Sequence, residues 1–194
     1  MKLGSEKMRR QVNNILSVAH SFFRFICLRI FNPSGVHTGL VERFSPNVVV
    51  EVNRGGILKL GSKVRVHSGC KLKVRHGAKM VIGENVKVNY NCIFVCRKYI
   101  EIGDGTEFGP NVLIYDHDHD YSVDLKEKKF KESSVRIGKN CWIGANTIIL
   151  RGTTIGDNCV VGAGSVVKGK FPNGSVIVQK RSTEILGEAR HSVL

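Results

Sequence analysis

The sequence IGKNCWIGANTIILRGTTIGDNCVVGAGSVV, residues 137–167, decides the fold of this protein. Within it an apolar residue recurs every six positions, and glycine often follows that residue directly. The series comprises Ile137, Ile143, Ile149, Ile155, Val161 and Val167. A period of six matches neither an α-helix nor the two-residue alternation of a strand. It predicts very short strands joined by tight turns, three hexapeptides to a coil, so that stacked coils share one apolar core.

The same period runs upstream, interrupted three times. Its members there are Leu60, Val66, Leu72, Ile82, Val88, Phe94, Ile102, Phe108 and Ile114. The first two breaks, from Leu72 to Ile82 and from Phe94 to Ile102, predict small turn insertions. The third, from Ile114 to Ile137, contains DHDHDYS and predicts a loop, residues 115–134, that projects from the stack.

The repeat also divides the chain of 194 residues, which is long enough for one domain with a terminal appendage. We expect a helical appendage, basic and apolar, over residues 1–45. The β-helix domain is expected over 46–178, and a C-terminal tail over 179–194.

The net charge and the cysteines indicate which partners the protein could bind and which cellular compartment it occupies. The net charge of +14 favours an anionic partner, such as a nucleic acid, an acidic membrane surface or a phosphorylated ligand. No aromatic-rich nucleic-acid motif accompanies the basic residues, so no nucleic acid is expected. The six cysteines form no CxxC pair, and no secretory signal is evident. Four of them occupy a small-residue position of the repeat, which predicts buried thiols in the cytoplasm.

The pattern from about Ile57 to Val178 resembles the hexapeptide-repeat acyltransferases, and residues 137–167 are highly specific for that group. The resemblance is strongest to sugar O-acetyltransferases, which include galactoside, maltose, capsule and lipopolysaccharide O-acetyltransferases. It implies a mainly β fold, a left-handed parallel β-helix. It also implies a homotrimer, acetyl-CoA as co-substrate and no metal, and a saccharide acceptor used in surface polysaccharide biosynthesis.

The resemblance assigns roles near the loop. In these enzymes a catalytic His follows a rung reading roughly IYxxxH, and here the matching residue is His119. A histidine suits the task because its ordinary pKa of about 6.5 lets it accept a proton near neutral pH. The acceptor-contacting Asn of an NxN step corresponds to Asn89 in VNYNC. Asp116 and His117, next to the catalytic position, are further expected substrate contacts.

The coenzyme groove follows from the same resemblance. A backbone N–H at Ala145 matches the donor that stabilises the oxyanion, and Ala163 matches a backbone contact to the adenine end of CoA. Trp142 matches an aromatic wall. The family's Gly-Asn-Pro turn after the last rung is replaced here by Gln179-Lys180-Arg181, so Lys180 and Arg181 compete with Lys168 as ligands of the CoA phosphates.

Each role has a structural alternative. His117 competes with His119, because residues two apart in an extended segment share a face. Asn89 also fits an asparagine ladder inside the coil, and Trp142 also fits simple packing.

Two other classes of protein use this fold. A zinc β-helix of the γ-carbonic anhydrase type requires three His, whereas the local pair here is His-x-His. A non-catalytic scaffold would not explain the matches at His119 and Asn89.

The segment Ile15–Phe31 precedes the repeat and is apolar, but His20, Arg24 and Arg29 interrupt it. It is too short and too charged to predict a transmembrane helix. Two interpretations stay open. A basic helix bearing aromatic side chains is suited to lie on an anionic membrane, which would place the enzyme at its inner face. Alternatively, the helix packs over the first coil or on a neighbouring subunit. Asn32-Pro33 is expected to end it.

Overall fold

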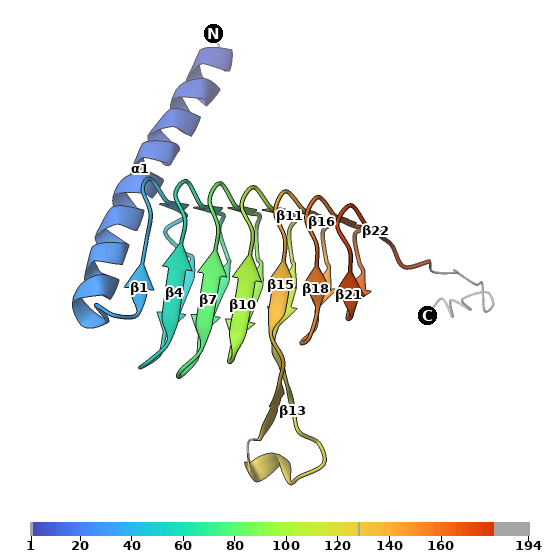
Figure 1. The fold of residues 1–194 in the computed structure, drawn as a ribbon. Coiled ribbons are helices and arrows are strands. Elements are labelled where there is room, and N and C mark those ends of the chain that lie inside the picture. The colour runs from blue at the N-terminus through green and yellow to red at the C-terminus, as the bar shows by residue number, and fades with distance from the viewer. Residues whose placement is uncertain (1, 128, 181–194) are drawn as a thin grey trace, which may run out of the picture.

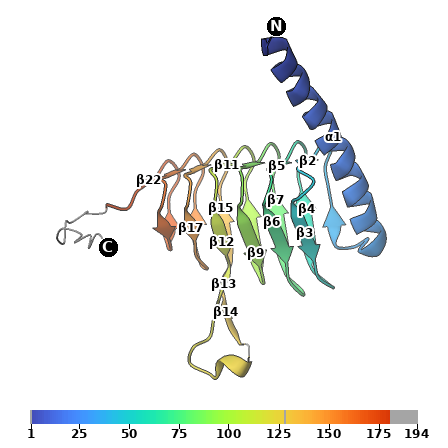
Figure 2. The same cartoon turned by 180° about the vertical axis from the view of Figure 1, so that it is seen from behind.

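The computed structural model describes residues 2–127 and 129–180. Three parallel sheets form the sides of a stack of coils, with one long helix across the first coil (Figures 1 and 2). The mainly β, hexapeptide-coil architecture predicted from the sequence is confirmed, as are the N-terminal helix and the projecting loop.

Each coil contributes one strand to each sheet in turn. Sheet A contains β1 (Val36–His37), β4 (Ile57–Leu60), β7 (Lys79–Ile82), β10 (Tyr99–Ile102), β15 (Val135–Ile137), β18 (Thr154–Ile155) and β21 (Lys170–Phe171). Sheet B contains β2 (Arg43–Phe44), β5 (Arg65–Val66), β8 (Lys87–Val88), β11 (Glu107–Phe108), β16 (Trp142–Ile143), β19 (Val160–Val161) and β22 (Val176–Ile177). Sheet C contains β3 (Val49–Val52), β6 (Lys71–Val74), β9 (Ile93–Cys96), β12 (Leu113–Tyr115), β17 (Ile148–Ile149) and β20 (Val166–Val167).

The core follows from the repeat, because its apolar positions all point inward. Ile82, Ile102, Ile137 and Ile155 lie in register in sheet A, and each is at most 2% exposed. Cys70, Cys92, Cys141 and Cys159 are buried free thiols that fill small inward positions at the turns. Asparagine or glycine occupies the left-handed conformation at many of these turns, for example Asn111 and Asn146, whose side chains are hydrogen-bonded.

Two corners of the stack carry the predicted site residues. The B–C corner is made of the turns that lead from sheet B to sheet C, residues 89–92, 109–112, 144–147 and 162–165. The C–A corner is made of the turns that lead from sheet C to sheet A, residues 97–98, 116–134, 150–153 and 168–169. The long insertion in the C–A corner forms a hairpin of β13 (His117–His119) and β14 (Phe130–Glu132), with the 3-10 turn η1 (Leu125–Glu127) at its tip.

Helix α1 (Lys2–Phe31) covers the open edge of the first coil with its C-terminal half, and its N-terminal half extends beyond the stack (Figure 1). The Phe25 ring packs edge-on against Phe44, with centroids 5.1 Å apart. The Ser21 hydroxyl accepts a 2.8 Å hydrogen bond from the Phe44 N–H of the edge strand β2. Strand pairing in the stack begins with β1 and β2, which precede the domain boundary expected at residue 46. No helix within the described ranges is long and apolar enough to cross a bilayer.

Candidate active site

Asp116 lies at the base of the hairpin and is fully buried. Its carboxylate accepts hydrogen bonds of 2.7–3.1 Å from the backbone N–H groups of Arg97, Lys98 and Tyr99. These three groups belong to the turn that the break between Phe94 and Ile102 predicted. Burial raises the pKa of Asp116, but the hydrogen bonds from His117 and from these N–H groups outweigh burial, so the pKa is lowered overall. The carboxylate therefore stays charged and holds the turn.

His117 is oriented by the same carboxylate. Its Nδ1 lies 3.0 Å from Oδ1 of Asp116, and its side chain is only 12% exposed. The rings of Tyr115 and Phe130 pack edge-on against it, at centroid distances of 5.8 and 5.6 Å. Asp116 stays a predicted substrate contact, but its side chain is buried and its hydrogen bonds are internal. His117 is nearly enclosed and supports the hairpin.

His119 has the opposite character, since it is exposed on the hairpin. It pairs in register with Phe130, and the two ring centroids are 4.6 Å apart. Its ring nitrogens have no hydrogen-bond partner within the described ranges. Two contacts steady the hairpin around it. The Arg97 guanidinium lies 3.6 Å from the centroid of Phe130, and Arg151 Nε lies 2.6 Å from a carboxylate oxygen of Asp118. The imidazole is thus presented to solvent on an anchored support.

The B–C corner gathers three other predicted residues along one edge. The ladder aligns Val88 with Phe108, Ile143 and Val161, so Asn89 falls in line with the glycines that precede Ala145 and Ala163. The backbone N–H groups of Ala145 and Ala163 have no hydrogen-bond partner in the described part of the chain. The Asn89 side-chain oxygen already accepts a 2.9 Å bond from the Tyr90 N–H, which leaves its amide N–H₂ for a ligand.

The remaining coenzyme candidates are scattered. Trp142 is 49% exposed on the outer face of sheet B, beside this corner. Lys168 follows β20 and therefore lies on the C–A corner. Lys180 is exposed and directly follows Gln179, whose amide bonds both the N–H and the C=O of Val166. Arg181 lies outside the described residues.

One chain therefore separates the site into two halves. His119 and Lys168 lie at the C–A corner, while Asn89, Ala145 and Ala163 lie at the B–C corner. Sheet C stands between the corners. At about 3.3 Å per residue, the six steps from residue 110 to residue 116 span roughly 20 Å.

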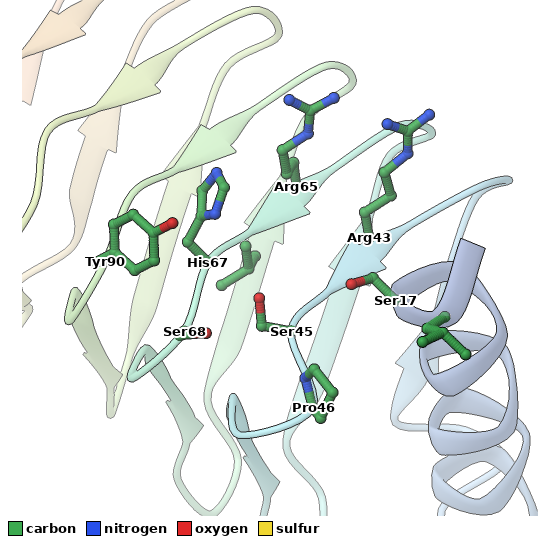
Figure 3. Close-up of a pocket in the computed structure, with 10 residues that line it drawn as sticks. Ser17, Arg43, Ser45, Pro46, Arg65, His67, Ser68 and Tyr90 are labelled. Carbon is green, nitrogen blue, oxygen red and sulfur yellow. The ribbon is translucent and has the colours of Figure 1, made fainter. Parts of the chain in front are cut away.

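Sequence reasoning missed a hollow of about 720 Å³ between α1 and the start of sheet B (Figure 3). Its lining includes Arg43, Arg65, His67, Ser68 and Tyr90. The sequence did contain a sign of this hollow, because basic residues recur every 22 positions at Arg43, Arg65 and Lys87. The first two coils each take 22 residues from one strand of sheet B to the next, instead of the 18 of three hexapeptides, and the hexapeptide series does not extend back to Arg43.

A zinc site of the carbonic anhydrase type needs three clustered ligands. Across residues 2–127 and 129–180, no group of three or more His, Cys, Asp or Glu side chains is placed to hold a metal ion.

The comparisons with known proteins concern the repeat and the fold. Residues 134–168 match the family model described as the hexapeptide repeat of succinyl-transferase. A probable acetyltransferase of Mycobacterium tuberculosis is 32% identical, over 81% of this chain and 53% of its own length. The galactoside O-acetyltransferase of Escherichia coli is 36% identical, over 50% of this chain and 48% of its own length. The chain thus spans about half the length of these curated relatives.

Among solved structures, AntD, an N-acyltransferase from Bacillus cereus in complex with dTDP and 3-hydroxybutyryl-CoA, superposes with a TM-score of 0.61 at 22% identity. The match covers 75% of this chain and 80% of that one. It shows that the coil architecture is shared.

Proposed function

We propose that this chain, whose residues 134–168 match a hexapeptide-repeat family model, is an acyltransferase that moves an acetyl group from acetyl-CoA to a hydroxyl of a saccharide. Two observations carry the proposal: an exposed imidazole at His119, and backbone N–H groups at Ala145 and Ala163. None of these groups has a hydrogen-bond partner within residues 2–127 and 129–180. A proton acceptor and an oxyanion donor are the two groups that acyl transfer to a hydroxyl needs. The acetyltransferase relatives support the same reaction.

In the proposed reaction, His119 takes the proton of the acceptor hydroxyl as its oxygen attacks the thioester carbonyl carbon. The new C–O bond gives a tetrahedral intermediate, whose oxyanion receives a hydrogen bond from the Ala145 N–H. The C–S bond then breaks, and the departing thiolate takes the proton back from the imidazolium. Proton transfer of this kind typically contributes about 10²–10⁴-fold, and one oxyanion donor about 10²–10³-fold.

The Ala145 and Ala163 N–H groups fit a bound acyl-CoA, because they follow one another along a single corner and have no hydrogen-bond partner in the described part of the chain. Trp142 supplies an apolar surface beside them. Lys168 and Lys180 are the described cations proposed for the CoA phosphates, with Arg181 as a further candidate from the sequence.

A homotrimer is part of the proposal. The roughly 20 Å between the two corners is too far for one acceptor hydroxyl to meet both His119 and Ala145 of the same chain. The hairpin projects away from its own stack (Figure 2), so it can reach the B–C corner of a neighbouring copy. Light scattering at micromolar concentration tests this, and a strictly monomeric particle that transfers acetyl groups would contradict it.

We also propose peripheral contact with the inner face of the cytoplasmic membrane. Helix α1 exposes Ile15, Phe22, Phe23, Ile30 and Phe31 while its other side packs on the stack. Apolar area of this kind, together with the net charge of +14, suits an anionic lipid surface. An acceptor for surface polysaccharide biosynthesis would be met there. Co-sedimentation with anionic vesicles tests the contact, using a variant with Phe23→Ser and Ile30→Ser as the control.

The function is tested by measuring release of the CoA thiol from acetyl-CoA with and without saccharide acceptors. We expect saccharide-dependent release together with an acetylated product of matching mass. Absence of transfer to every neutral and phosphorylated saccharide offered, by protein that binds CoA, would overturn the proposed acceptor class.

A further inference from the structure

Two arginines lie side by side at the start of sheet B. Arg43 in β2 and Arg65 in β5 are direct partners in the parallel ladder, and neighbouring strands are about 4.8 Å apart. Neither side chain has an ion pair or hydrogen bond in the described part of the chain. Like charges directly opposite each other destabilise a sheet. An uncompensated pair at this position therefore indicates a site for an anion.

Two basic side chains on later coils show the usual arrangement, in which a carboxylate lies opposite the cation. Lys87, next in line after Arg65, pairs with Glu107, and Arg136 on sheet A pairs with Glu101. The acidic residue nearest in sequence, Glu42, is buried on the opposite side of β2, and Arg29 is the cation that acts on it. Within residues 2–127 and 129–180, Arg43 and Arg65 therefore lack the carboxylate partner that Lys87 has.

Both arginines line the 720 Å³ hollow beside α1 (Figure 3). Ser45 and Ser68 line it and have hydroxyls with no hydrogen-bond partner within residues 2–127 and 129–180. Guanidinium groups form planar, paired hydrogen bonds to phosphate, and hydroxyls supply further donors. The chemistry of this lining matches a phosphate or diphosphate group.

An aromatic wall closes the side of the hollow that faces the proposed active site. The His67 and Tyr90 rings lie 4.8 Å apart with an interplanar angle of 37°. Burial, and secondarily the charge of Arg65, lower the pKa of His67, so this ring is neutral near pH 7. The wall offers apolar ring faces next to the cationic part of the hollow.

Register places this hollow next to the proposed acceptor residue. Val66 pairs with Val88, so His67 is one rung away from Asn89. Arg65 and Asn89 are separated by one rung and two residues along the strand, roughly 8 Å. Ala145 lies two rungs farther along the same corner, about 10 Å beyond Asn89. The order along the stack is therefore anion pocket, acceptor residue, oxyanion donor.

We propose that the pocket of Arg43, Arg65, Ser45, Ser68 and the His67–Tyr90 wall binds the phosphate or diphosphate group of the acceptor. The acceptor is then a phosphorylated saccharide, whose sugar ring spans the distance from Arg65 to Asn89. Its role as an acceptor rests on the function proposed above, whereas binding of the anion does not. A soluble sugar phosphate and a lipid-linked saccharide diphosphate share this chemistry.

The test is calorimetric titration of the full chain with inorganic pyrophosphate and with a soluble sugar 1-phosphate. The variants are Arg65→Gln and the double change Arg43→Gln with Arg65→Gln. The matched control is Arg136→Gln, which removes one equal charge from sheet A. We expect wild type and the control to bind pyrophosphate, and the double variant to bind about tenfold more weakly or worse. The melting temperature of Arg65→Gln at low salt should equal or exceed that of wild type, because the substitution relieves repulsion.

A second measurement distinguishes the acceptor's anion from the phosphates of CoA. Pyrophosphate should bind equally well with and without saturating CoA. Competition between the two would overturn the proposal, because the arginines would then belong to the coenzyme site. Equal binding of pyrophosphate by wild type and the double variant would overturn it as well, unless a lipid-linked saccharide diphosphate shows arginine-dependent binding.

Titration with two kinds of ligand distinguishes a soluble phosphorylated acceptor from a lipid-linked one. Arginine-dependent binding of the soluble sugar phosphate supports a free acceptor. Arginine-dependent binding only of a detergent-solubilised, lipid-linked saccharide diphosphate supports a lipid-linked one. If neither binds in an arginine-dependent way while a neutral sugar is still acetylated, the pocket proposal fails and the function stands. If binding depends on the arginines but no acceptor is acetylated, the function fails and the pocket stands.

Discussion

The Oδ1 atom of Asp116 lies 3.0 Å from Nδ1 of His117, and this contact joins the turn at residues 97–99 to the hairpin that presents His119. The two histidines of DHDHDYS therefore have different environments. His117 is held by a buried carboxylate and nearly enclosed, whereas His119 is exposed and its nitrogens have no hydrogen-bond partner among the residues that the structure describes. The alternation of Asp and His thus places the fixed His117 two residues before the exposed imidazole of His119.

Asp116→Ala is expected to destabilise the protein strongly. The change leaves the N–H groups of Arg97, Lys98 and Tyr99 without their acceptor in a buried setting, at a cost of about 3 kcal/mol or more. Denaturant unfolding measures the loss. The control is Asp118→Asn, whose exposed pair with Arg151 should contribute less than about 1 kcal/mol. Equal effects of the two changes would show that the Asp116 contacts do not hold the turn.

The contribution of Asp116 should depend on pH in a defined direction. Its pKa is lower in the folded protein than the usual value of about 3.9, so the folded state favours the charged form. The stabilisation is fully present above that usual value and is lost as pH falls through the lowered folded-state pKa. The difference in unfolding free energy between wild type and Asp116→Asn should be constant above about pH 5 and shrink below pH 4. A difference that grows on acidification would contradict the assigned direction.

Phe25→Ala should loosen the docking of α1 on the first coil. Phe25 is buried against Phe44, and removal of a buried phenylalanine side chain costs roughly 3 kcal/mol. Phe23→Ala is the matched control, because Phe23 is on the same helix but 67% exposed, and its effect should stay within about 0.5 kcal/mol. Thermal unfolding of both variants, with hydrogen exchange at the Phe44 amide, is the measurement. Full protection of that amide in Phe25→Ala would mean that the helix does not depend on this contact.

The coils could be predicted from the sequence because their period is set by inward-facing side chains. Ile137, Ile143 and Ile149 point into one core from the three successive sides of a single coil, so their spacing alone specifies the turns between them. The loop after Ile114 was predicted for the same reason, since it breaks that spacing.

The contacts of the site could not be predicted in this way. The acceptors of the Arg97, Lys98 and Tyr99 N–H groups are decided by three-dimensional proximity to Asp116, which has no sequence period. The separation of His119 from Ala145 was hidden as well, because a repeat shows which rung a residue occupies but not whether one chain or two complete the site. The pairing of Arg43 with Arg65 depends on long first coils that the hexapeptide series does not cover.

The central claim is that His119 is the proton acceptor and His117 its neighbouring support. The direct measurement compares the kcat of saccharide-dependent acetyl transfer for wild type, His119→Ala and His117→Ala, with calorimetric CoA binding for each. We expect His119→Ala to lower kcat by about 10²–10⁴-fold with CoA affinity little changed, and His117→Ala to have a much milder effect. Near-full activity in His119→Ala would contradict the account, and loss of activity in His117→Ala alone would show that the other imidazole is the base.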